Sequence, residues 1–215
     1  MSVLNYDRPF GGIPVGTTDG SPWQGSLRRC RANAGVNIFR GDKVVHGSTG
    51  VQGGFTVSVN NAANTITDGS IVGLMISPVV NRDSAATEHP GYSPNSGTND
   101  VLVATAPNLL MVVQEDNVTD PIAFIDLGRR SIDVTTTLGS TVTGIATWEL
   151  ESNTSASSTT GPVRLYAFYD RPDNIQADDS GAPGGGGVTA DNRPKWICTW
   201  YVPDQYLYNV AAADL

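Results

Sequence analysis

Apolar and polar positions alternate over several short stretches of the chain, which is the pattern of strands that bury one face. Residues 55–59 and 144–150 alternate in this way, whereas residues 70–76 form a nearly continuous apolar run, typical of a central strand. Other predicted strands lie at 36–39, 43–46, 101–104, 109–115, 122–125, 132–134, 163–169 and 196–202. The turn at 40–42 is predicted to close a hairpin between the first two of these. About eleven short strands, and no segment with a helix cap and a helical period, favour an all-β sandwich or barrel-like core.

Residues 1–29 differ from the rest because they contain three prolines and five glycines. Both residue types exclude a regular helix and weaken a strand, so this stretch is predicted to be an extended arm and a poor strand former. Tyr6, Phe10, Ile13 and Trp23 are unfavourable in a disordered tail, which favours an arm that docks on another surface. A mobile terminus is the alternative.

Three parts are therefore expected: a docking arm over residues 1–29, a β-rich core over 30–207 and a C-terminal tail over 208–215. The segment 81–100 is predicted to be a long loop, whose length suggests a contact or lid role, or simple mobility. Whether the core forms one lobe or two, divided near this loop, stays open.

The charge of the chain bears on its partners. It has 215 residues, with 13 basic and 21 acidic side chains and a net charge of −8. Such a surface repels phosphate backbones and anionic lipid, so we expect neither nucleic acid nor a membrane as a partner. Arg28, Arg29 and Arg31 form the one tight basic cluster. No apolar run is long enough to span a bilayer and no signal-peptide pattern is seen, so we expect a soluble protein made in a cytosol.

The two cysteines, Cys30 and Cys198, are far apart in the sequence. Two thiols do not make a disulfide framework, and no Cys-x-x-Cys pair occurs. Buried free thiols are the favoured prediction, although pairing between the two stays open.

No residue pattern in the sequence is specific for catalysis. His46 and His89 have no accompanying His or Cys ligands at metal-binding spacing, so no zinc or iron site is predicted. No Gly-x-Ser-x-Gly elbow occurs. Glu149 and Glu151 share a predicted strand face, but a solvated strand edge explains them better than a glycosidase pair. We predict no catalytic residue, no metal site, no cofactor and no enzymatic activity, and a hydrolase is the least favoured function.

Acidic residues near the C-terminus leave a calcium site open as an alternative. Their oxygen atoms suit this cation, although their spacing is not that of an EF-hand loop. Turn residues that cap the backbone are the favoured explanation. The residues are Asp170, Asp173, Asp178 and Asp179.

Aromatic residues of the later strands leave a sugar-stacking platform open as a second alternative. Each lies in an apolar-rich segment, so burial in the core is the favoured prediction. They are Trp148, Trp196, Trp200 and Tyr201.

The order of short segments along residues 30–207 resembles that of the head decoration, or cement, proteins of tailed bacteriophages. The matching segments are 37–44 (NIFRGDKV), 70–73 (SIVG), 101–104 (VLVA), 112–116 (VVQED), 127–128 (LG), 139–144 (GSTVTG), Leu150 with Asn153-Thr154, 164–166 (RLY), 171–174 (RPDN) and 196–206. The chain departs from the resemblance in its apolar tail, residues 210–215.

The resemblance implies a β-rich fold, a small homo-oligomer and the major capsid protein as partner. It carries over no catalytic residues. The expected location is the outer capsid surface of the virion, after synthesis in the cytoplasm of a bacterial host. A phage adhesion or tail-associated module that binds host glycans is the alternative function. The arm and the 81–100 loop supply the predicted contact residues: Tyr6, Phe10, Ile13, Trp23, His89 and Tyr92.

Overall fold

The computed structural model describes residues 9–32, 37–46, 56–59, 71–79, 91–94, 99–116, 122, 126–128, 131–132, 134–135, 139–152, 161–171 and 193–200. These residues form twelve β-strands and one short 3-10 helix, η1 (Trp23–Ser26). The all-β prediction is confirmed. The C-terminal tail, Tyr6 and His89 lie outside the described residues.

Five strands form a closed barrel in the order β2-β5-β4-β6-β8. Their bounds are β2 (Leu27–Ala32), β4 (Lys43–His46), β5 (Thr56–Val59), β6 (Ile71–Val79) and β8 (Asp100–Ala104). All neighbours are antiparallel except β2 and β5, which are parallel. The barrel interior is a cluster of small and medium apolar side chains that includes Val44, Val57 and Val103.

A second, five-stranded sheet has the order β1-β9-β12-β11-β10 and is antiparallel throughout. Its bounds are β1 (Ile13–Thr17), β9 (Leu109–Gln114), β10 (Ser131–Ile132), β11 (Val163–Phe168) and β12 (Lys195–Trp200). On β12 every second residue is buried, and Trp196, Cys198 and Trp200 share that face as the alternation predicted. A two-stranded pair, β3 (Ile38–Phe39) with β7 (Tyr92–Ser93), completes the fold.

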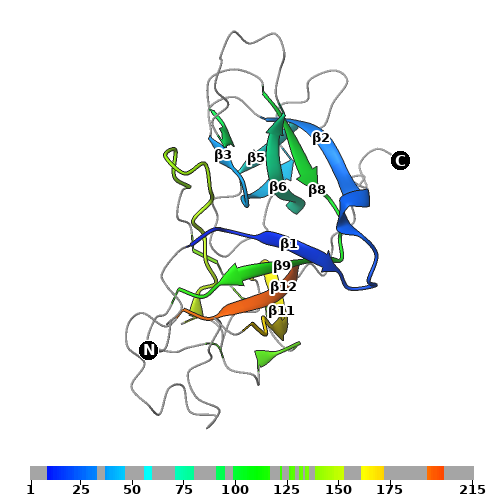
Figure 1. The fold of residues 1–215 in the computed structure, drawn as a ribbon, viewed down its shortest axis with the longest axis vertical. Helices are drawn as coiled ribbons and strands as arrows, with labels where there is room; N and C mark the ends of the chain where they lie inside the picture. The colour runs from blue at the N-terminus through cyan, green and yellow to red at the C-terminus, as the bar shows by residue number, and fades with distance from the viewer. Residues whose placement is uncertain are drawn as a thin grey trace, which may run out of the picture.

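The barrel and the sheet lie one above the other, and β1 is the strand of the sheet that lies next to the barrel (Figure 1). One large core cluster joins the two because it combines barrel residues such as Leu74 and Ala104 with sheet residues such as Met111 and Trp196. The β-rich core is thus two substructures joined by one apolar cluster, and the barrel holds a second cluster of its own.

The predicted arm is extended over its described part, residues 9–29, but these residues belong to both sheets. β1 pairs with β9, and β2 pairs with β8 and crosses the expected boundary between residues 29 and 30. The expectation of a poor strand former is therefore wrong for β1 and β2. Pro14 is tolerated because β1 is the edge strand, and its register with β9 shifts between Pro14 and Gly16.

Two predicted strand relationships are also corrected. The turn at 40–42 does not close a hairpin, because β3 pairs with β7 while β4 pairs with β5 and β6. Residues 144–150 contain isolated bridges at Ile145 and Leu150 rather than a regular strand. Ala146, Trp148 and Leu150 belong to the core cluster that joins barrel and sheet. The alternation of apolar and polar residues in this segment therefore reflects burial of every second side chain and not pairing in a sheet.

Candidate functional site

The turn between β3 and β4 is the anchor of the candidate site. The Phe39 N–H donates to the Asp42 carboxylate at 2.7 Å, and the Asp42 N–H returns a bond to the Phe39 carbonyl at 3.0 Å. The Gly41 N–H donates to the Met75 carbonyl at 2.8 Å, which fastens the turn to β6. Gly41 has φ +90°, and a Cβ there would lie 2.6 Å from the Phe10 carbonyl oxygen, so glycine is required.

The segment before β1 is docked on this turn. The Gly41 carbonyl oxygen accepts two hydrogen bonds, from the Gly12 N–H at 3.0 Å and from the Trp148 indole N–H at 2.7 Å. Gly11, with φ +65°, lies so close that a Cβ would be 2.6 Å from the same oxygen. The chain entering β1 is therefore held rigidly against the barrel.

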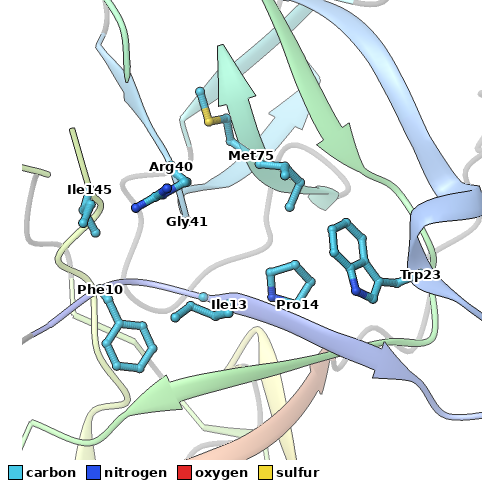
Figure 2. Close-up of a pocket in the computed structure, with 10 residues that line it drawn as sticks. Phe10, Ile13, Pro14, Trp23, Arg40, Gly41, Met75 and Ile145 are labelled. Atoms are coloured by element: carbon cyan, nitrogen blue, oxygen red, sulfur yellow. The ribbon is translucent and has the colours of Figure 1, made fainter. Parts of the chain in front are cut away.

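A pocket of about 410 Å3 opens beside this junction. Figure 2 shows Ile13 and Pro14 on β1, Met75 across from them, and Trp23 at one end. Arg40 is the charged residue among the ten that line it. The lining residues are Phe10, Gly12, Ile13, Pro14, Trp23, Arg40, Gly41, Met75, Ile76 and Ile145. The arrangement suits an apolar group that carries, or lies beside, a negative charge.

Exposed apolar side chains continue from the pocket along β1. Ile13 is 47% exposed and Val15 is 44% exposed, which is unusual for large apolar residues of a strand. Ile13 also lines the pocket, and Val15 follows it two residues later on the same strand. We call this surface, made of Ile13, Val15 and the pocket, the β1 surface.

The structure brings three of the predicted contact residues together. Phe10, Ile13 and Trp23 all line the pocket. Tyr92 lies apart from them on β7, where its ring packs on Phe39 with centroids 5.0 Å apart. Sequence reasoning missed Arg40, Met75 and Ile145, because they come from segments far from the N-terminus and no local pattern links them to it.

The arginine cluster on β2 is partly neutralised. The Arg29 Nε donates to the Asp100 carboxylate at 2.6 Å, and the Arg31 Nε lies 3.7 Å from the other Asp100 oxygen. Arg28 is exposed and has no acidic partner among the described residues. One aspartate therefore offsets part of the charge of the three arginines.

Two buried carboxyl groups, those of Asp42 and Glu115, accept hydrogen bonds from groups of the protein itself. Burial raises the pKa of Asp42 to about 7, although the Phe39 N–H and nearby Lys43 act in the opposite direction. Burial also raises the pKa of Glu115 to about 8. Two hydrogen bonds to its carboxylate, from the Ile122 N–H at 2.8 Å and from the Trp196 Nε1–H at 2.9 Å, lower this pKa but do not outweigh burial. Each carboxyl group ties a backbone segment to the core.

Glu149 was predicted to lie on a solvated strand edge, and this is wrong. It is buried, and its carboxylate pairs with Arg193 at 3.1 Å. Glu151, in contrast, is partly exposed. Leu150, between them, is fully buried because this segment is sandwiched in the shared core.

The described residues bear on the two alternatives left open by the sequence, a calcium site and a sugar-stacking platform. Within the described ranges no group of three or more acidic, His or Cys side chains is placed to hold a metal ion. Asp170 is exposed, and the other three aspartates of the calcium alternative lie outside those ranges. Trp148, Trp196 and Trp200 are buried in the core, as favoured, so they form no stacking platform. Tyr201 is outside the described residues.

Comparisons with known proteins add no relative. No family model, no curated protein and no solved structure matches this chain. Among the described residues no helix is long and apolar enough to cross a membrane.

Proposed function

We propose that this protein binds the outer surface of a tailed-phage capsid and reinforces the contacts between major capsid protein subunits. The observation that carries the proposal is the β1 surface, where Ile13 and Val15 are about half exposed beside an apolar pocket. A contiguous exposed apolar surface is typical of a site that another macromolecule covers. The capsid is favoured as that macromolecule by the segment order that resembles decoration proteins.

The rigidity of the junction suits a docking role. β1 is paired with β9, and the segment before it is tied to Gly41. Side chains held in place before binding lose little conformational entropy when a partner covers them. A capsid lattice repeats the same contact many times, so a small homo-oligomer gains avidity from individually weak contacts.

The glycan-binding alternative has lost its main candidate platform. Stacking of a sugar ring needs an exposed aromatic face, and Trp148, Trp196 and Trp200 are buried. Trp23, the remaining tryptophan, is half-buried at the end of the pocket. We therefore favour a protein partner.

Binding of the purified protein to expanded, undecorated phage heads tests the proposal. We expect saturable co-sedimentation, and cryo-electron microscopy of the bound fraction should show the protein at repeated lattice positions. Heads already saturated with their own decoration protein are the control and should bind little. No binding to undecorated heads, together with binding to a glycan array, would replace the capsid function with the adhesion function.

A further inference from the structure

We propose that the pocket takes one apolar side chain from an extended segment of the partner protein, and that Arg40 pairs with a carboxylate beside that side chain. The inference rests on the proposed function for the identity of the partner, the major capsid protein. It goes further in naming the chemistry of the segment that binds.

The pocket fits an apolar anchor. Its volume of about 410 Å3 lies within the ~300–1,000 Å3 typical of sites that enclose a small ligand, so a single large side chain can enter. Ile76 and Ile145 line it together with residues of the N-terminal segment, whereas the Met75 side chain points away from the pocket into the barrel cluster (Figure 2). Interfaces commonly gain most of their affinity from one or a few anchors buried in such pockets.

Arg40 fits a carboxylate. Its backbone is held on both sides, since its N–H donates to the Gly144 carbonyl at 3.2 Å and its carbonyl accepts from the Ala146 N–H at 2.9 Å. The side chain is exposed, and no acidic group in the described part of the chain pairs with it. A guanidinium presents several N–H groups in a planar fork that matches a carboxylate. A cation on the wall of an apolar pocket, with no acidic partner among the described residues, therefore favours an acidic neighbour for the anchor.

The exposed face of β1 favours a protein segment over a free small molecule. Ile13 lines the pocket, and Val15, two residues further along β1, is also exposed. A small carboxylate in the pocket would leave Val15 exposed. An extended segment that follows β1 covers Val15 as well as the pocket.

Paired variants test this inference on undecorated heads. Arg40→Glu reverses the charge at the pocket, and Arg28→Glu makes the same change at another exposed arginine without an acidic partner in the described residues. Ile13→Asp places a charge at the pocket. Its control, Tyr166→Asp, places the same charge outside the pocket, on β11, at a residue of similar exposure, 51%. We expect Arg40→Glu and Ile13→Asp each to weaken binding at least about ten-fold, with the two controls within about two-fold of the native chain. Thermal unfolding of each variant confirms that the fold is kept.

A second measurement identifies the bound segment. Short overlapping peptides from the major capsid protein are titrated against the protein while tryptophan emission is followed, because Trp23 lines the pocket and the other three tryptophans are buried. We expect a peptide with an apolar residue next to Asp or Glu to change the emission, and Arg40→Glu to abolish the change.

The outcomes separate this inference from the proposed function. Equal binding of the native chain, Arg40→Glu and Ile13→Asp to heads overturns the pocket as the docking site and leaves the capsid function standing. Equal weakening by Arg28→Glu and Arg40→Glu also overturns it, because bulk charge then explains the loss. Self-association that depends on Arg40 overturns it in favour of a second copy as the occupant. Absence of binding by the native chain refutes the capsid function itself.

Discussion

The indole N–H of Trp148 donates a 2.7 Å hydrogen bond to the carbonyl oxygen of Gly41, 107 residues earlier in the chain. The same oxygen accepts the Gly12 N–H. The Lys43 ammonium lies over the Trp148 ring, 5.7 Å from its centroid. One buried side chain thus connects the N-terminal segment, the β3–β4 turn and the segment around residue 148. Its bond also fixes Gly41, which lines the pocket of the β1 surface.

Replacing Trp148 with Phe should destabilise the protein. The change removes the N–H donor and leaves a void beside Gly41, so we expect the free energy of unfolding to fall by about 2–3 kcal/mol. Urea unfolding followed by circular dichroism measures it. Trp23→Phe, at a half-buried position, is the control and should change stability by less than about 1 kcal/mol. Equal effects of the two substitutions would contradict the role given to the Trp148–Gly41 bond.

Glycine at position 73 is required by the approach of β6 to β8. A Cβ there would lie 1.9 Å from the Ala104 backbone oxygen, and backbone of a paired strand has little room to move. Gly73→Ala should therefore lower stability by about 3 kcal/mol or more, or prevent folding.

Gly16→Ala is the matched control for that substitution. A Cβ at Gly16 meets no atom within 4 Å, and its φ is not in the left-handed region. We expect a change between zero and a stabilisation of about 1 kcal/mol, because alanine restricts the unfolded chain. Thermal unfolding measures the stability of both variants against the native chain. A Gly73→Ala variant as stable as the native chain would disprove the close contact between β6 and β8.

Stability should fall as the pH rises from about 4 to about 8. The folded-state pKa values of Asp42 and Glu115 are raised to about 7 and about 8, so below these values the folded protein keeps protons that the unfolded chain releases. The free energy of unfolding then decreases with pH by at most about 1.4 kcal/mol per unit for each such group, and levels off above about pH 8. The lowered pKa of Asp19 acts only below this range. Urea unfolding at several pH values measures the slope.

The Glu115→Gln variant assigns part of that slope. Glutamine still accepts the Ile122 N–H but offers no second acceptor to Trp196, so stability near pH 5 should be lower than in the native chain. Because glutamine does not ionise, the decline toward pH 8 should be shallower, with Asp42 responsible for the remainder. An unchanged slope would show that Glu115 does not titrate in this range.

Both thiols should be unreactive in the folded protein. Cys30 and Cys198 are buried free thiols on β2 and β12, in different sheets, as the sequence favoured. Burial raises the pKa of each, so little thiolate forms at pH 8. A thiol reagent should therefore label neither in native buffer and both after denaturation without reductant. Absence of labelling in denaturant would reveal a disulfide.

The sequence by itself determined most of the strands after residue 36 and, for several of them, which face is buried, whereas β1 and β2 were not predicted as strands. The alternation in β12 correctly placed Trp196, Cys198 and Trp200 in the core. The apolar run around Leu74 correctly marked a buried strand, β6. Period-two alternation reports burial because successive side chains of a strand point to opposite faces, and this is a local property.

Only the tertiary structure decided which strands pair and what meets at the β1 surface. The turn at 40–42 joins strands that pair with other partners, and β8 and β9 enter different sheets although only four residues separate Ala104 from Leu109. Backbone donors and acceptors are the same at every non-proline residue, so pairing leaves no side-chain signature in the sequence. The N-terminal aromatics indicated a contact surface, whereas only long-range hydrogen bonds bring the other residues to it. Arg40 bonds to the backbone of Gly144 and Ala146, on either side of Ile145, and the neighbouring Gly41 carbonyl accepts the Gly12 N–H.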